Sequence, residues 1–256
     1  MFETLIAESE GPLGRITLNR PDKLNPLSTE TLQELARAAR YFDERPEVKV
    51  VIVSGKGRAF SAGADLTSFS GPSDLSAQEV GEIGRQMADA IEGMRALAIA
   101  EIQGWCVGGG LVLAAACDLR VVAESARFSI PEVDLGIPLA WGGIPRLVRE
   151  IGPAMTKELV LTCRPFDAAE AKASGFVNRV VPDTELSKTV QDLAESLCEK
   201  ASLTLLATKR HVNAVTDQMV GTMRSWSDAD GLAIALQDED CADARRRYLT
   251  RRSEKS

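Results

Sequence analysis

Short apolar runs and helical periodicity alternate in the first part of the chain. Residues 15–18 and 49–54 are short and rich in β-branched side chains, which is typical of strands, whereas residues 29–42 carry their apolar side chains on one helical face. Two further strand-like runs, 99–102 and 119–122, enclose a glycine triplet and an apolar helix. This alternation of strands and helices predicts an α/β fold.

The pattern becomes mostly helical beyond residue 154. Apolar residues recur with helical spacing at 155–162, 168–174, 185–200 and 203–215. A long charged tail begins at residue 226. We therefore expect an α/β core over residues 1–195 and a helical C-terminal region over residues 196–256. Residues 67–80 contain Ser, Gly and Pro and predict a loop that borders a pocket.

Composition and charge narrow the class of partner. The 256 residues are 45% hydrophobic and 26% charged, and the net charge of −7 argues against nucleic acid. The longest uncharged run, residues 105–117, is too short to span a membrane. Five scattered cysteines without a C-x-x-C pair argue against both a zinc site and a disulfide framework. We expect a soluble cytoplasmic protein that holds no metal.

The chain lacks the residues that several common types of enzyme site require. The single histidine, His211, falls mid-helix among polar neighbours, where we expect it on the surface, and one histidine cannot form an H-E-x-x-H metal motif. A Ser-His-Asp triad would have to use His211. No G-x-G-x-x-G follows a strand, and residues 54–57 lack the spacing of a phosphate-binding loop. Backbone electrostatics and carboxylates remain, with no separate cofactor expected.

Two glycine-rich corners are suited to binding an oxyanion. Gly108, Gly109 and Gly110 precede the apolar helix 111–117, and glycine at a helix N-terminus exposes unpaired N–H groups to a ligand. Close packing of that helix on a strand is the alternative explanation. Residues 59–66 form a second corner of small residues after the strand 49–54, for which a tight turn is the alternative. Two such donors aimed at one oxygen would form an oxyanion hole.

A set of short motifs follows in order along the chain: Asn19-Arg20-Pro21, Asn25-Pro26-Leu27, residues 60–66, Gly104, the glycine triplet, Cys117-Asp118, Phe128, Pro131-Glu132, Gly142-Gly143 and Arg146-Leu147. This ordered set resembles the crotonase family, the enoyl-CoA hydratases and isomerases. The resemblance implies repeated β-β-α units with a helical C-terminal region that builds trimers or dimers of trimers. It also implies acyl-CoA or enoyl-CoA thioester substrates, in which coenzyme A is part of the substrate and not a cofactor.

The resemblance assigns binding roles to residues of both corners. The backbone N–H groups of Ala64 and Gly109 fall at the positions that hold the thioester oxygen and stabilise an enolate. Further CoA or substrate contacts are expected at Lys23, Ala62, Asp65, Leu66 and Trp141. Arg20, Lys23, Lys56 and Arg58 are either phosphate contacts or solvated surface charges. The arginines at 245–247 and 251–252 have the same two interpretations, or contact a neighbouring subunit.

Glu132 is similar in position to an acid/base glutamate of the family. A carboxylate beside an enolate can take a proton from C2 and deliver it elsewhere when burial raises its pKa. A capping or surface glutamate is the alternative. Asp134 would share a face with Glu132 in an extended segment but need not do so in a turn.

The chain departs from the family pattern at Val112, where the hydratases carry a second glutamate. Adding water uses both carboxylates, whereas one is enough to shuttle a proton, so we expect 3,2-enoyl-CoA isomerisation, with enoyl-CoA hydration as the alternative. The aspartate of dienoyl-CoA isomerases would fall near Ala140 or Trp141 and is absent. Trp141 either narrows the acyl site, stacks on an unusual acyl group or packs in the core. Val112 and Trp141 also leave open a non-catalytic acyl-CoA binding protein.

Overall fold

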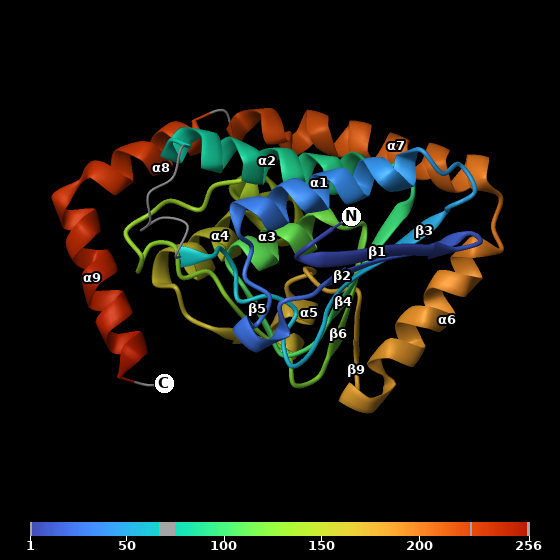
Figure 1. Cartoon of the computed structure of the whole chain (residues 1–256), viewed down its shortest axis with the longest axis horizontal. Helices are drawn as coiled ribbons and strands as arrows, with labels where there is room; N and C mark the ends of the chain where they lie inside the picture. Colours follow the sequence, from blue (N-terminus) through green and yellow to red (C-terminus); the bar gives the residue numbers. More distant parts are fainter. Residues whose placement is uncertain (1, 67–74, 226, 255–256) are drawn as a thin grey trace.

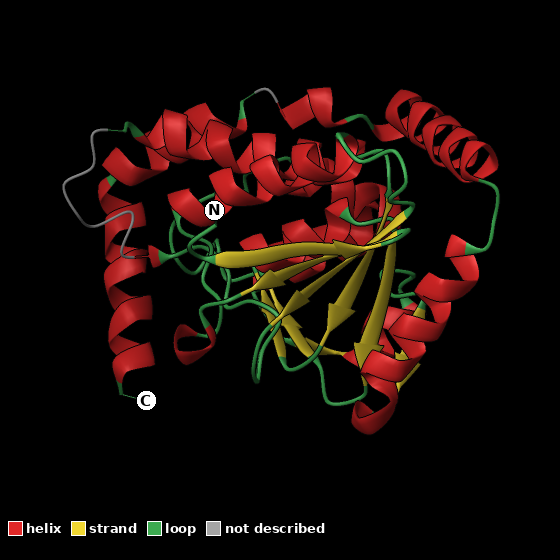
Figure 2. Ribbon diagram, turned by 45° about the vertical axis from the view of Figure 1, so that its right-hand side comes forward, coloured by secondary structure: helices red, strands yellow, loops and turns green. Residues whose placement is uncertain are grey.

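The strands form two sheets in the computed structural model, which describes residues 2–66, 75–225 and 227–254 (Figure 2). The large sheet has the spatial order β1 (Leu5–Glu10), β2 (Leu13–Leu18), β3 (Val50–Gly55), β4 (Leu97–Ile102), β6 (Leu119–Ala123) and β9 (Arg179–Val181). Only β1 is antiparallel to its neighbour in this sheet. The small sheet comprises β5 (Trp105–Val107), β7 (Arg127–Ser129) and β8 (Phe166–Asp167).

Helices follow single strands or pairs of strands along the chain, and the last helices follow one another. They are α1 (Thr29–Asp43), α2 (Ala77–Gly93), α3 (Gly109–Ala116), α4 (Gly143–Thr162), α5 (Ala168–Ala173), α6 (Leu186–Cys198), α7 (Ser202–Val220), α8 (Asp228–Gln237) and α9 (Glu239–Ser253). Short 3-10 helices lie at Pro21–Lys23, Asp183–Glu185 and Thr222–Ser225. In the pairs β4–β5 and β6–β7 the first strand joins the large sheet and the second joins the small one, before α3 or α4 follows. The expected repetition of β-β-α units is confirmed.

The central strands of the large sheet are buried on both faces. In β3, Val51 and Val53 point into the main core, whereas Val50 and Ile52 pack with residues of α6 on the opposite face. Successive strand residues point to opposite faces, so a strand covered on both sides needs a continuous apolar run. The continuous apolar run at 49–54 is therefore explained by the packed layers that cover both faces of this sheet.

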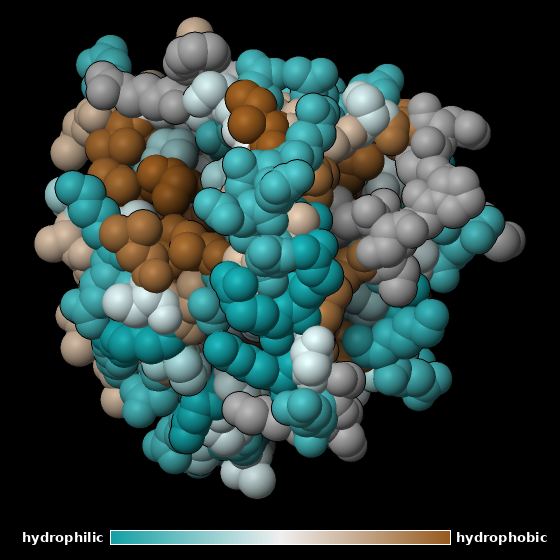
Figure 3. Space-filling view, turned by 90° about the vertical axis from the view of Figure 1, so that its left-hand side faces the viewer, coloured by the Kyte–Doolittle hydropathy of each residue, from teal (hydrophilic) through white to brown (hydrophobic). Residues whose placement is uncertain are grey.

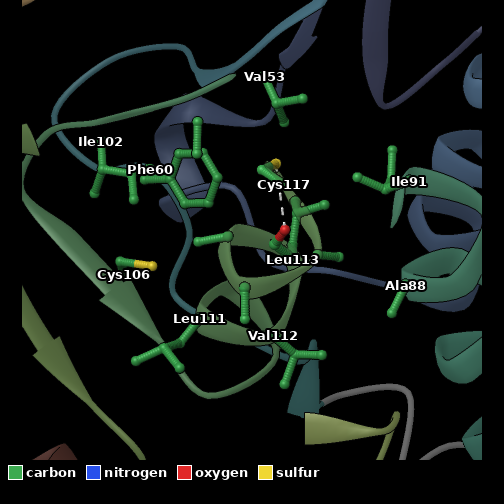
Figure 4. Packing of buried hydrophobic residues seen from close by; sticks show 14 of the residues in the cluster. Val53, Phe60, Ala88, Ile91, Ile102, Cys106, Leu111, Val112, Leu113 and Cys117 are labelled. Carbon is green, nitrogen blue, oxygen red and sulfur yellow. Dashed lines mark hydrogen bonds between the residues drawn. The ribbon is translucent and has the colours of Figure 1, made fainter. Parts of the chain in front are cut away.

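Helix α3 lies inside the protein. All eight of its residues are buried, which fits a helix that is apolar on every side. Figure 4 shows side chains from β3, β4, β5 and α2 around it, together with Phe60. The N-terminus of α3 is thereby fixed relative to both sheets.

Several predicted element bounds need correction. Residues 67–74 of the expected loop lie outside the described part of the chain, and residues 77–80 are helical instead. They open α2, where Ser76 and Glu79 form a reciprocal capping box. Helix α4 begins at Gly143, twelve residues before the helical pattern expected from residue 155, because the break at Gly152 and Pro153 interrupts its periodicity.

The C-terminal helices lie against the core from outside the sheet. Figure 1 shows α7 and α8 running along one side and α9 turning away at the end of the molecule. Lys209 of α7 is buried, and its Nζ donates to Asp118 Oδ2 at 2.8 Å and to the Ala96 carbonyl at 2.9 Å. His211 is exposed, as expected. The expected boundary at residue 195 falls within α6 and stays a prediction. No helix within the described ranges is long and apolar enough to cross a membrane.

Arg146 joins the beginning of α4 to α2. Its fully buried guanidinium donates to Asp89 Oδ1 at 2.9 Å and to Glu92 Oε2 at 2.6 Å. It also donates to the carbonyl oxygens of Trp141 and Gly142, at 3.2 and 3.3 Å. This buried charge joins the two helices, and its loss would remove one of two arginine partners from each carboxylate and a donor from the two carbonyl oxygens.

Replacing Arg146 with methionine is expected to lower the free energy of unfolding by about 3 kcal/mol. This is the low end for removing one partner of a buried ion pair, because both carboxylates are partly exposed. The matched control is Arg164→Met, since Arg164 also pairs with two glutamates but is 35% exposed, and it should cost about 0–1 kcal/mol. Urea unfolding measures both, and equal losses would contradict the assignment.

Candidate active site

The two glycine-rich corners lie side by side. Ser61 forms an isolated parallel bridge with Cys106 of β5, and the Val107 N–H donates to the Ser61 carbonyl at 3.0 Å. Gly63 has a φ of +88°, and a Cβ placed on it would lie 2.7 Å from the Val107 carbonyl oxygen. Only glycine permits this approach. The same Cβ position is 3.6 Å from the Gly109 nitrogen, so the second corner directly adjoins the first.

Two backbone donors at these corners are unpaired. The Leu27 N–H donates to the Gly63 carbonyl at 2.8 Å, and the Asp65 N–H donates to the Leu27 carbonyl at 3.0 Å. The N–H of Ala64, between these two residues, takes part in neither bond. Gly109 is the first residue of α3, where a helix has no internal acceptor for its N–H groups. Among the described residues, neither N–H has a hydrogen-bond acceptor. Ala64 and Gly109 line the same cleft, and the helix dipole adds positive potential there.

Glu132 faces these donors from a turn after β7. The Ile137 N–H donates to the Glu132 carbonyl at 2.9 Å, which closes the turn. The side chain is 8% exposed, and a Cβ on Gly108 would overlap its Oε1, so the glycine makes room for the carboxylate. Its Oε2 is buried without a partner within the described structure. Burial raises the pKa of Glu132 from 4.5 to about 7.

The cleft around Glu132 is mostly apolar. Its inner part has a cavity volume of about 30 Å³ and is lined by Ala64, Gly109, Val112, Glu132, residues 137–141 and Leu232. An adjoining part is lined by residues 62–64, Leu66, residues 107 and 108, Pro131, Glu132, Leu135, Ile137 and Tyr248. Among the described lining residues, Glu132 supplies the only carboxylate of either part.

Of the other residues predicted for this region, some line the cleft and one does not. Val112 and Ala140 both line the cleft, so its surface is apolar at the two positions where the family resemblance places a further carboxylate. Asp134 is exposed and its N–H donates to Cys163 Sγ, because the segment is a turn and not an extended strand. Trp141 is buried and lines the cleft.

Two of the expected CoA contacts line the outer part of the cleft. Ala62 and Leu66 line it, whereas Lys23, Lys56 and Arg58 are exposed and their contacts with phosphate stay predictions. The Asp65 carboxylate pairs with Arg20 Nη1 at 3.0 Å, which holds the corner and leaves its contact with CoA a prediction as well.

Sequence reasoning missed residues that support or close the cleft. Asn25 is buried, and its side chain bonds to the Lys56 and Ala59 carbonyls at 3.0 and 2.9 Å, which ties two loops together. It belongs to the motif Asn25-Pro26-Leu27, which is the sequence signal that marks it. Leu232 of α8 and Tyr248 of α9 line the cleft from the C-terminal helices. No local sequence signal marks either of them.

Comparison with known protein families shows to which family the chain belongs. A sequence model described as enoyl-CoA hydratase/isomerase matches residues 8–255. The chain belongs to this family. A crotonyl-CoA hydratase from Syntrophomonas wolfei is 36% identical over 240 residues, which are 93% of this chain and 92% of that protein. A peroxisomal Delta(3,5)-Delta(2,4)-dienoyl-CoA isomerase from Arabidopsis thaliana is 34% identical over 245 residues, covering 89% and 88% of the two chains.

Solved structures agree with this crotonase-family assignment. The crystal structure of an enoyl-CoA hydratase/isomerase from Mycobacterium paratuberculosis matches with a TM-score of 0.88 and 27% identity. The match covers 96% of this chain and 99% of that one. The crotonase-like fold expected from the motifs is therefore confirmed. In this crotonase-family chain, no group of three metal-ligating side chains occurs within the described ranges.

Replacing Glu132 with glutamine is expected to stabilise the protein at alkaline pH. A carboxylate whose folded pKa of about 7 exceeds its ordinary 4.5 favours the folded state only while protonated, and its ionisation progressively destabilises that state between these values. The gain in unfolding free energy should approach about 3 kcal/mol near pH 8 and shrink toward zero near pH 5. Thermal and urea unfolding across this range measure it.

The matched control for this test is Asp134→Asn, which removes an exposed carboxylate from the same turn. It should change stability by less than about 0.5 kcal/mol at either pH. A Glu132→Gln variant whose stability relative to wild type does not change with pH would show that Glu132 is not held in an unfavourable environment.

Proposed function

We propose that this chain converts 3-enoyl-CoA thioesters into 2-enoyl-CoA thioesters, with Glu132 as its single acid/base. The observation that carries the proposal is the pairing of one buried carboxylate, with a raised pKa, with two unpaired N–H groups in one apolar cleft. Two preorganised donors stabilise negative charge on a thioester oxygen. A base with a pKa near 7 can both accept and return a proton at neutral pH.

The proposed reaction moves one proton and one double bond. The Glu132 carboxylate takes a proton from C2, and the electrons of that C–H bond form a dienolate whose oxygen accepts hydrogen bonds from the Ala64 and Gly109 N–H groups. The protonated Glu132 then delivers the proton to C4. The C2–C3 double bond forms as the C3–C4 double bond is lost, so the atoms and charge balance and Glu132 ends as a carboxylate.

Hydration is the second candidate, and the name of a relative favours it. The protein from Syntrophomonas wolfei is named a crotonyl-CoA hydratase. Adding water to a 2-enoyl thioester requires a group that orients and deprotonates the water, and the family resemblance assigns part of that task to a second glutamate. Val112 stands at this position, is buried and offers no hydrogen bond. Proton transfer by Glu132 alone therefore fits the cleft better.

The substrate's coenzyme A would extend through the outer cleft. Ala62 and Leu66 lie there, and the exposed Lys23, Lys56 and Arg58 are available to its phosphates. Coenzyme A belongs to the substrate in this proposal, and no separate cofactor is needed. The five cysteines are free thiols, which fits a reducing compartment, and we assign the chain to the cytoplasm.

We also propose that the chain forms a homotrimer or a dimer of trimers. Exposed large apolar side chains gather on the C-terminal helices, at Leu203, Val212, Val215, Met219 and Ile234. The end that carries α8 and α9 shows apolar areas on both sides of a polar band (Figure 3). Exposed apolar surface of this kind is typical of a subunit interface.

The variant Glu132→Gln should lower kcat/KM for a 3-enoyl-CoA by about 100-fold or more, because the amide cannot take the C2 proton. Wild-type kcat/KM should rise with pH to a plateau, with an apparent pKa of about 7, since only the carboxylate acts as the base. Asp134→Asn is the control and should retain the wild-type rate and profile. Full activity of Glu132→Gln on both 3-enoyl and 2-enoyl substrates would remove Glu132 from the reaction.

The variant Val112→Glu tests whether the missing carboxylate limits hydration. Formation of 3-hydroxyacyl-CoA from a 2-enoyl-CoA should increase relative to isomerisation, because a second carboxylate in the cleft can orient water. Val112→Gln is the matched control of similar size without the base. An unchanged ratio in Val112→Glu would show that the absence of this carboxylate does not explain the preference.

A further inference from the structure

The indole of Trp141 fills the space between two helices at the inner end of the cleft. A Cβ on Gly84 of α2 would overlap its pyrrole atoms, and a Cβ on Gly109 of α3 would overlap its benzene edge. Both helices therefore approach the ring through glycines. The side chain reaches from the proposed oxyanion donor to the wall formed by α2.

Contacts from three helices hold Trp141 and its backbone in place. Trp141 has a φ of +61°, a left-handed conformation that costs free energy for a bulky residue. Its carbonyl accepts from Arg146 Nη1 at 3.2 Å, and the next N–H, that of Gly142, donates to Asp228 of α8 at 2.9 Å. Contacts from α4, α8 and α2 thus hold the ring in the cleft.

The ring leaves little apolar space beyond the reacting carbons. The inner cleft has a cavity volume of only about 30 Å³, room for about two water molecules. Leu232 of α8 and Leu139 line it as well, and both are buried. Because the benzene edge of Trp141 lies against Gly109, a chain that extends from a thioester held there meets the indole within a few carbon atoms.

We propose that Trp141 closes the acyl pocket and restricts the enzyme to short acyl chains, an inference that rests on the proposed acyl-CoA function. Stacking of the indole on an aromatic acyl group would need an open ring face, but Trp141 is only 6% exposed and two helices cover it. Its packing and its position in the cleft are therefore one feature: the side chain completes the core and sets the depth of the pocket.

Binding of saturated thioesters tests this limit independently of the reaction. Butyryl-, octanoyl- and dodecanoyl-CoA would be titrated by calorimetry into wild type, Trp141→Ala and Trp141→Phe, with free coenzyme A as reference. Each buried methylene is worth about fourfold in affinity. Wild type should bind octanoyl-CoA no more tightly than butyryl-CoA, whereas Trp141→Ala should favour octanoyl-CoA by about 100-fold, with Trp141→Phe between them.

The matched control is Trp105→Ala, which removes an indole that is 43% exposed on β5 and lines neither part of the cleft. It should keep the wild-type order of affinities. Tighter binding of dodecanoyl-CoA than butyryl-CoA by wild type would overturn the proposal, as would an unchanged order in a folded Trp141→Ala. If that variant does not fold, the wild-type series and Trp141→Phe decide.

A turnover panel separates this inference from the proposed function. Wild type should isomerise 3-butenoyl-CoA and 3-hexenoyl-CoA at least about 10-fold faster than 3-dodecenoyl-CoA, in kcat/KM. Equal rates at all lengths would overturn the limit set by Trp141 while supporting isomerisation. No turnover of any enoyl-CoA, together with tight and selective binding of butyryl-CoA, would refute the proposed reaction and leave the limit standing.

Discussion

Close backbone contact between the corner at Gly63 and the corner that opens α3 is the constraint on which the site depends. The Cβ position of Gly63 is 2.7 Å from the Val107 carbonyl, and the absence of a side chain at Gly108 leaves room for the Glu132 carboxylate. Either contact would be impossible with a larger residue. The burial of α3 on all sides then fixes the direction of the Gly109 N–H.

The same site contains a carboxylate, that of Glu132, whose ionised form is unfavourable in its surroundings. Glu132 lies in an apolar cleft with one oxygen unpartnered among the described residues, so its charged form is destabilised and its pKa is raised. Such a group reduces the stability of the protein above neutral pH but becomes a base of suitable strength.

A second set of contacts joins the inner cleft to the exterior helices. Arg146 binds carboxylates of α2 and the carbonyls of Trp141 and Gly142, while Asp228 of α8 accepts from the Gly142 N–H. Leu232, one turn further along α8, lines the cleft. The shape of the acyl site is therefore set jointly by α2, α4 and α8, which are far apart in the sequence.

The sequence by itself determined the alternation of strands and helices and the two glycine corners, because periodicity and short motifs are local properties of the chain. Its resemblance to the crotonase family implied the β-β-α units and singled out Glu132. The sequence did not locate the start of α2, although the Ser76–Glu79 capping box is a local signal for a helix start, or the start of α4, where a break at Gly152 interrupts the apolar pattern. Only the tertiary structure showed that Asp134 is exposed, that Tyr248 and Leu232 reach the cleft and that Trp141 lies between two glycines. These features depend on contacts between distant segments, which no local pattern encodes.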